Sequence, residues 1–236
     1  MLERQQLQVQ DPSSHTFWHW VRFELVAEAV ASGNAEVVLD VGAGSGMLGD
    51  WMLTAMASTV YRFEELSPVL DRALTDHFGA HARHDDAARI SSRTVVAVLD
   101  VVEHVEDDLA MMTDLAKRMD PGASLVVTVP ALQWAFSSWD TELGHYRRYS
   151  RPQVRRLLER AGFDVAGVAY LFPEMLPMLP IRKLRRARRT DVDFPQLSHR
   201  VNQLGYRVSH ATARVRRIWP AGTSVVAMAT KPGADS

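Results

Sequence analysis

The chain has 236 residues, of which 47% are hydrophobic and 23% charged, and its formal net charge at pH 7 is -1. These values predict one globular domain with a sizeable core, and the balanced charge gives no whole-molecule case for binding nucleic acid or anionic membranes. The absence of cysteine excludes disulfides, thiolate metal sites and a cysteine nucleophile. Residues 1–15 are polar, and no stretch is long and apolar enough to cross a bilayer. We therefore expect a cytoplasmic protein that is soluble or lies peripherally on the inner face of the membrane.

Helix-like and strand-like segments alternate along the chain. An N-terminal helix is expected over residues 17–31, where Trp18, Val21, Leu25 and Ala29 recur near helical spacing. Strands are expected over residues 36–41, 59–64, 80–84, 94–100, 124–129, 163–170 and 223–230, and further helices over residues 46–57, from 68, over 106–119 and after 150. This alternation predicts an α/β fold with a parallel, doubly wound sheet.

The chain between the last two expected strands is longer than the sheet requires, and we expect residues 171–221 to form a helical cap insertion within the single domain, residues 1–236. Its later part repeats apolar residues at helical spacing, which predicts one amphipathic helix: Leu197, Val201, Leu204, Val208, Ala211, Val215 and Ile218. That apolar stripe could be buried on the domain, on a second subunit or in a membrane. Residues 182–217 hold ten arginines and one lysine against two aspartates. Residues 172–189 could therefore contact an anionic membrane or admit a lipid-linked acceptor, or they could be a solvated cap, and a nucleic-acid role is less favoured.

Residues 37–46, VVLDVGAGSG, predict a buried strand that runs into a glycine-rich turn and a helix. Glycines allow the tight turn and a close approach of the backbone to a nucleotide-like ligand, and Glu65 follows at the distance expected of an acid that binds ribose hydroxyls. The spacing of Gly44, Gly46 and Gly49 also fits the dinucleotide fingerprint, so an NAD(P)-dependent oxidoreductase is the alternative. Asp40 favours a cationic ligand instead, because a pyrophosphate prefers a helix N-terminus free of nearby anions.

The segment LDVGAGSG resembles motif I of class I methyltransferases that depend on S-adenosylmethionine (SAM), and later motifs occur in that family's order. The sequences DVVEHV at residues 100–105 and GHYRRYS at residues 144–150 are closest to a bacterial branch of the family. The resemblance implies a Rossmann-like, seven-stranded, mostly parallel sheet with helices on both faces, whose last strand is antiparallel. It also implies that SAM, and its product S-adenosylhomocysteine, would be bound by Arg22, Asp40, Gly42, Ala43, Gly44, Glu65, Leu66, Asp86 and Asp100. In the N-terminal segment, His15, Trp18 and Trp20 resemble the family's aromatic lead helix.

Two histidines follow the strands from which the family's acceptor side is built. His104 and His145 are the expected catalytic residues, because the pKa of histidine lies near neutrality and a base could take the acceptor's proton. The alternative for His104 is that it only packs beside the cofactor. Acceptor recognition is expected from Asp140, Tyr146, Arg147 and Arg148, unless these residues form an ion-pair cluster that anchors their loop.

Asp100, Glu103, His104 and His145 also resemble the set that holds a divalent metal in small-RNA 2′-O-methyltransferases. Aspartate stands at the first position where those enzymes have glutamate, and metal-free relatives carry Glu-His here as well, so no metal is expected. We expect methyl transfer to a small-molecule, sugar-linked or lipid-linked acceptor, with O-methylation favoured over N- or C-methylation. A non-catalytic SAM-binding protein is a further alternative.

Overall fold

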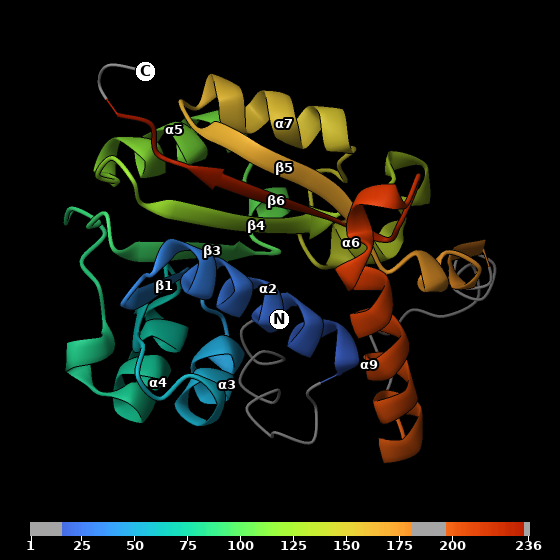
Figure 1. The fold of residues 1–236 in the computed structure, drawn as a ribbon, viewed down its shortest axis with the longest axis horizontal. Coiled ribbons are helices and arrows are strands. Elements are labelled where there is room, and N and C mark those ends of the chain that lie inside the picture. The colour runs from blue at the N-terminus through green and yellow to red at the C-terminus, as the bar shows by residue number, and fades with distance from the viewer. Residues whose placement is uncertain (1–15, 181–196, 234–236) are drawn as a thin grey trace.

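The computed structural model describes residues 16–180 and 197–233, which form one six-stranded sheet flanked by helices (Figure 1). The strands follow the order β2-β1-β3-β4-β6-β5. Their bounds are β1 Val37–Val41, β2 Val60–Glu64, β3 Thr94–Leu99, β4 Ser124–Pro130, β5 Asp164–Leu171 and β6 Ser224–Thr230. The first four strands pair in parallel, whereas β6 is antiparallel to both β4 and β5. The carboxyl ends of β1 to β5 therefore share one edge of the sheet, where ligands of open α/β sheets bind.

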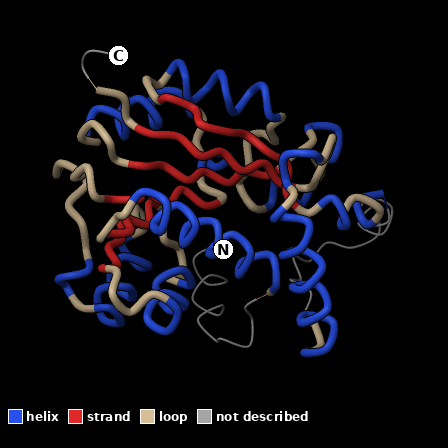
Figure 2. Tube along the Cα trace, in the orientation of Figure 1, coloured by secondary structure: helices blue, strands red, loops and turns tan. Residues whose placement is uncertain are grey.

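Helices cover both faces of the sheet (Figure 2). They enclose two apolar clusters, one on each face. On one face α5 (Asp108–Arg118) and α7 (Arg151–Arg160) contribute Met112, Leu115, Val154 and Leu158 to the core. On the other face lie α2 (Phe17–Gly33), α3 (Met47–Ala55) and α4 (Pro68–Phe78). The central strand β3 is almost entirely buried, as expected for a parallel strand covered on both faces.

The predicted helix starts after Ser67 and Ser150 are confirmed. The Ser67 hydroxyl accepts a hydrogen bond from Leu70 N at 3.4 Å, and Pro68 occupies the first turn of α4. Ser150 and Gln153 form the expected capping box of α7. These local signals were readable because each satisfies the free N–H groups of its own helix end.

The expectation of a strand at residues 80–84 is wrong, and the described sheet has six strands rather than seven. Residues Ala80–Ala82 form a single 3-10 turn, η2, which is closed by a hydrogen bond from Ala82 N to Gly79 O. The chain reaches the sheet edge only at Arg83, in one parallel bridge to Phe63. The left-handed φ of Gly79, 87°, turns the chain too sharply for a longer pairing with β2.

The segment between β5 and β6 contains the 3-10 turn η5 (Pro173–Met175), helix α9 (His199–Arg214) and the 3-10 turn η6 (Arg216–Ile218). The expected helix over residues 197–218 is therefore shorter and ends in η6. Helix α9 lies beside the start of α2, near the carboxyl ends of the strands (Figure 1). Residues 181–196, which include six of the eleven basic side chains of residues 182–217, lie outside the described residues, as does His15. No helix in residues 16–180 or 197–233 is long and apolar enough to span a membrane.

Candidate active site

The glycine-rich loop after β1 has the backbone geometry that its sequence predicts. Gly42, Gly44 and Gly46 have φ of 72°, 59° and 81°, a left-handed region that strains other residues. Gly42 N donates a hydrogen bond to the carbonyl oxygen of Glu64 at 2.8 Å, so the loop is tied to the end of β2. A Cβ atom on Gly42 would lie 2.8 Å from Cγ2 of Val101, in the loop after β3. The loops after β1 and β3 are therefore in contact.

Glu65 spans the loops after β1 and β2. Its Oε2 accepts a hydrogen bond from Gly44 N at 2.8 Å, and its Oε1 accepts one from Ser67 N at 2.9 Å. Each carboxylate oxygen keeps acceptor capacity for a ribose hydroxyl. The adjacent Leu66 is 89% exposed, which leaves its side chain free to cover one face of a ligand ring. Glu64, by contrast, is buried and bound to His84 and Arg118.

Asp40 lies beneath the loop rather than at the surface. Its side chain is buried and accepts a hydrogen bond from the Tyr61 hydroxyl at 3.1 Å. Burial raises the pKa of Asp40 to about 7, and the hydrogen bond from Tyr61 opposes that rise. Asp40 thus supports the loop from below.

Arg22 and Asp100 form an ion pair with 2.9 Å between Nη2 and Oδ2. Arg22 is buried and also donates to the Ser224 hydroxyl at the start of β6, at 3.0 Å. Asp100 has a left-handed φ of 55°, and its side chain keeps 35% of its surface exposed. Arg22 and Asp100 were both expected to bind the cofactor, and the structure places them in contact. Of the two, only Asp100 has a side chain that is partly exposed to solvent.

Asp86 is exposed in the loop that follows the bridge between Phe63 and Arg83. That bridge brings the start of the loop beside the end of β2. The expected contact of Asp86 with an adenine amino group stays a prediction.

The catalytic candidates His104 and His145 are neighbours although 41 residues separate them in sequence. Their rings meet edge to face with centroids 4.5 Å apart. His104 belongs to the 3-10 turn η3 (Val102–His104) after β3, and His145 follows the short helix α6 (Ser138–Glu142). Partial desolvation of its ring, together with the nearby His145, lowers the pKa of His104, so its neutral form prevails at neutral pH.

Asp140 is fully buried and binds both His145 and Arg148. Its Oδ1 lies 3.1 Å from Nδ1 of His145, and its two oxygens accept from Nε and Nη2 of Arg148 at 2.8 and 3.1 Å. Burial alone would raise the pKa of Asp140, but the hydrogen bonds from His145 and Arg148 lower it to about 2. Both Asp140 and Arg148, expected to bind the acceptor, therefore face inward and hold His145 and its loop in place.

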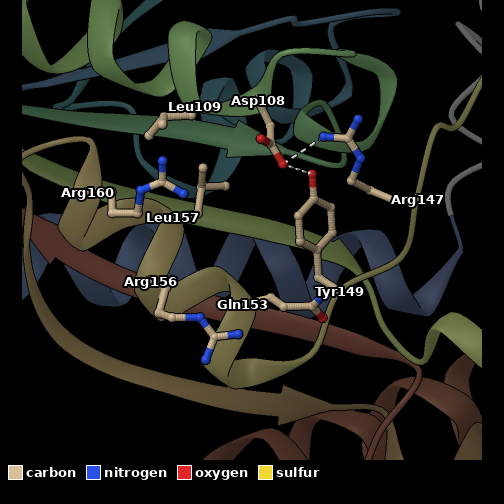
Figure 3. A pocket seen from close by; sticks show the side chains of 8 residues that line it. All are labelled: Asp108, Leu109, Arg147, Tyr149, Gln153, Arg156, Leu157 and Arg160. Carbon is tan, nitrogen blue, oxygen red and sulfur yellow. Dashed lines mark hydrogen bonds and ion pairs between the residues drawn. The ribbon is translucent and has the colours of Figure 1, made fainter.

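Tyr146 and Arg147 remain at the surface. Tyr146 is 52% exposed, and the guanidinium of Arg147 lies 5.8 Å from its ring centroid. Figure 3 shows Arg147 and Tyr149 converging on the carboxylate of Asp108, at 2.9 and 2.8 Å, on the wall of a surface hollow of about 210 Å³ between α5 and α7. The residues around this hollow include Arg156 and Arg160 but neither histidine nor the glycine-rich loop.

Glu103 lies beside the two histidines and was not among the expected catalytic, cofactor-binding or acceptor-binding residues. It is 1% exposed, and its Oε2 atom has no hydrogen-bond partner within the described residues. Burial and the nearby Asp100 raise the pKa of Glu103 well above its usual value. One ligand atom from each of Glu103, His104 and His145 lies within 4.8 Å of the others, a donor set that suits manganese or zinc better than magnesium. The only sequence signal for Glu103 was its place in the acid-x-x-Glu-His pattern.

A comparison with known protein families matches residues 17–168 to the methyltransferase domain family. A search of curated protein sequences finds no match. Among solved structures, the protein in complex with the Haloferax volcanii Trm112 methyltransferase activator superposes with a TM-score of 0.59 at 16% identity, over 97% of this chain and 94% of that chain. A SAM-dependent methyltransferase from Archaeoglobus fulgidus gives 0.51 at 15% identity, over 89% and 94%. Phosphoethanolamine N-methyltransferase 2 of Haemonchus contortus, solved with SAM, gives 0.54 at 13% identity, over 95% and 59%.

The family match covers more than half of the chain, and the structural likenesses show a shared fold. The glycine-rich loop and the acid at Glu65 fit an adenosine-type cofactor and not a metal-only site. These findings leave the oxidoreductase alternative without support. The chain belongs to the methyltransferase domain family, and it shares its fold with solved SAM-dependent methyltransferases.

Proposed function

We propose that the protein methylates an oxygen atom of a small-molecule, sugar-linked or lipid-linked acceptor. The observation that carries this proposal is the pair of His104 and His145, with ring centroids 4.5 Å apart, beside the loop that contacts the glycine-rich turn. A hydroxyl acceptor needs a base to take its proton as its oxygen attacks, whereas a neutral amine attacks through a lone pair it already has. Two adjacent imidazoles suit the hydroxyl.

The cofactor would be held by side chains at the ends of β1, β2 and β3. In this arrangement Glu65 accepts hydrogen bonds from the ribose hydroxyls, Asp86 meets the adenine amino group and Asp100 faces the ammonium group. The loop residues Gly42, Ala43 and Gly44 supply backbone N–H groups and leave room for the ligand. Leu66 covers the adenine, while Arg22 and Asp40 support these contacts from inside the fold.

His145 is the better placed base, because Asp140 decides which ring nitrogen carries the proton. Asp140 has a pKa of about 2, so it is ionised at neutral pH and can only accept a hydrogen bond. Nδ1 of His145 must then carry the proton, which leaves Nε2 free to accept one from the acceptor hydroxyl. SAM, when bound, supplies a methyl group on a sulfonium, which is a good leaving group. His104 orients the acceptor oxygen beside that base.

The acceptor is expected to carry an anionic group near Tyr146 and Arg147, which are the surface residues of the GHYRRYS loop. Arg147 already shares its guanidinium with Asp108, so a phosphate or carboxylate would bind to its remaining donors. We further propose that residues 171–221 are a cap over the acceptor side, because α9 and η5 lie at the carboxyl edge of the sheet. Residues 172–189, which were expected to contact a membrane, are described only as far as residue 180.

The experiment combines calorimetry with SAM and a screen of hydroxyl and amine acceptors by transfer of labelled methyl. We expect SAM to bind in the micromolar range, and turnover to fall by about 10²-fold in His145→Ala and in His104→Ala with SAM affinity unchanged. The matched control is His81→Ala, a change at an exposed histidine on η2. Full turnover in the double variant, or transfer only to amines, would contradict the proposal.

A further inference from the structure

Helix α9 turns its apolar stripe away from the protein. The stripe residues in α9 and η6 are exposed by between 40% and 71%: Val201, Leu204, Val208, Val215 and Ile218. They make up five of the twelve large hydrophobic side chains that are exposed in the part of the chain the structure describes. The amphipathic pattern is thus present, but the domain does not bury its apolar side.

The opposite, mostly polar face of α9 is the one that packs on the domain, and specific contacts fix it there. Asn202 is buried and accepts a hydrogen bond from Phe17 N at 2.7 Å. Ser209 is fully buried and donates to Glu174. Gly205 lies so close to α2 that a Cβ atom on it would be 2.5 Å from Cδ1 of Phe17. Rotating the helix to bury the stripe would break all three contacts, so the stripe stays outward.

The exposed side of this segment is strongly basic. Residues 197–219 contain no aspartate or glutamate. Four arginines here are exposed and form no ion pair with any residue in the described ranges: Arg200, Arg207, Arg214 and Arg217. The carboxylates that do reach this segment, Glu24, Glu28 and Glu174, are bound to other side chains: His210, Tyr206, Arg216, Ser209 and Thr212.

The arginines run along one edge of the stripe. Arg200, Arg207 and Arg214 recur every seven residues, and each directly precedes a stripe residue. At 100° per residue, this spacing gives a row of cations parallel to the row of apolar side chains. An apolar face with basic side chains beside it is the pattern of a helix that lies in the plane of a membrane surface, with guanidinium groups at the phosphates.

We propose that this face of α9 and η6, formed by the five stripe residues and their flanking arginines, docks on an anionic lipid surface. A second copy of the chain is a poorer occupant, because two such faces would bring their unpaired arginines together. A nucleic acid would use the arginines but leave the apolar stripe in water. The proposal concerns where the protein is held and does not depend on the acceptor that it methylates.

The test measures sedimentation of the full-length protein with vesicles made of equal parts phosphatidylcholine and phosphatidylglycerol. We expect the protein to bind these vesicles at low salt and not to bind vesicles of pure phosphatidylcholine. Binding to the mixed vesicles should weaken at about 0.5 M salt. Leu204→Gln and Arg207→Glu should each weaken binding by at least about five-fold. The matched controls are Leu53→Gln, at a site 62% exposed on α3, and Arg72→Glu on α4, and both should bind like the unchanged protein. The altered side chains are exposed, so thermal unfolding should be unchanged and SAM should bind as before.

Three results would overturn the proposal. The first is absence of vesicle binding at low salt, and the second is equal weakening by the α9 changes and by their controls, which would place the contact elsewhere. The third is a dimer in solution that Leu204→Gln dissociates while no vesicles bind, since the stripe would then be a contact between copies. A failure to bind SAM would count against the proposed function but not against this docking surface.

Discussion

Nδ1 of His145 lies 3.1 Å from Oδ1 of Asp140, and the same oxygen lies 2.8 Å from Nε of Arg148. One buried carboxylate thus holds a cation and an imidazole at the same time. Arg148 also donates to the carbonyl oxygen of Ala131, at the end of β4, at 3.2 Å. The orientation of His145 is therefore set through Asp140 and Arg148 by the edge of the sheet.

The change Asp140→Asn should lower turnover by about 10-fold or more without changing SAM affinity. An asparagine amide no longer requires the proton to lie on Nδ1 of His145, so the base is present in its useful tautomer only part of the time. The control is Arg148→Lys, which disturbs the same buried pair but keeps the carboxylate against His145. Equal losses of kcat in the two variants would show that the cluster only stabilises the loop.

The change Glu65→Gln should weaken SAM binding by about 10-fold, because an amide has only one oxygen to accept the hydrogen bonds that Glu65 receives from Gly44 and Ser67 and, in the proposed complex, from the ribose. Titration calorimetry measures the effect. Glu36→Gln, a change on the surface at a site paired with Arg93, serves as control. Unchanged SAM affinity in Glu65→Gln would remove Glu65 from the cofactor site.

In the unchanged protein, the free energy of unfolding should fall as pH rises from about 4 to about 7, and the change Asp40→Asn should make this fall smaller. Because folding raises the pKa of Asp40 from 3.8 to about 7, the folded state holds a proton that the unfolded state has released between these values. Stability therefore falls as pH rises from about 4 to about 7, by up to about 4 kcal/mol from this group alone. Denaturant unfolding at several pH values measures it, with Asp114→Asn, at an exposed position, as control. A constant difference in free energy between the two proteins across that range would contradict the assignment.

The change Arg22→Met should lower the free energy of unfolding by about 1 to 3 kcal/mol. Breaking a fully buried ion pair would cost more, but the side chain of Asp100 is about one-third exposed. In a double-mutant cycle with Asp100→Asn, the coupling energy should be about 1 kcal/mol or more. The exposed pair of Lys117 and Asp114 offers the comparison, and its coupling should be near zero. Equal coupling in the two cycles would mean that Arg22 does not depend on Asp100.

Dialysis against a chelator should leave turnover unchanged, because methyl transfer from a sulfonium needs no Lewis acid to activate its leaving group. The measurement is the initial rate before and after EDTA, with manganese or zinc added back. A loss of rate that manganese or zinc restores, and that Glu103→Gln abolishes, would instead make Glu103, His104 and His145 a metal site.

Local features of this fold were predictable because their causes are local. The buried β3, the left-handed turn of Gly42 to Gly46 and the capping box of Ser150 each follow from side chains within a few residues. The strand prediction for residues 80–84 was wrong because the sequence pattern reveals neither the turn at Gly79 nor that only Arg83 pairs with β2.

The directions of individual side chains in the site were less predictable. Arg147 and Arg148 are adjacent and chemically alike, yet Arg147 lies at the surface and Arg148 is buried. The difference depends on Asp140, which only the folded loop brings to Arg148. The same holds for α9, whose periodicity predicted an amphipathic helix but not that Asn202 and Ser209 would take the inner side.

The register of β5 and β6 suggests a way to exchange the segment that we propose as the acceptor cap. Leu171 pairs directly with Ser224, so the two ends of the intervening segment are held about 5 Å apart by the sheet itself. The pairing of β5 with β6 therefore does not require a particular length of chain between them, although Phe172 and Ala213 of that segment are buried in the core. A graft of the corresponding segment from another methyltransferase at Leu171 and Ser224 should therefore fold on the same sheet, and new acceptor preferences can be introduced there while the cofactor loops stay as they are.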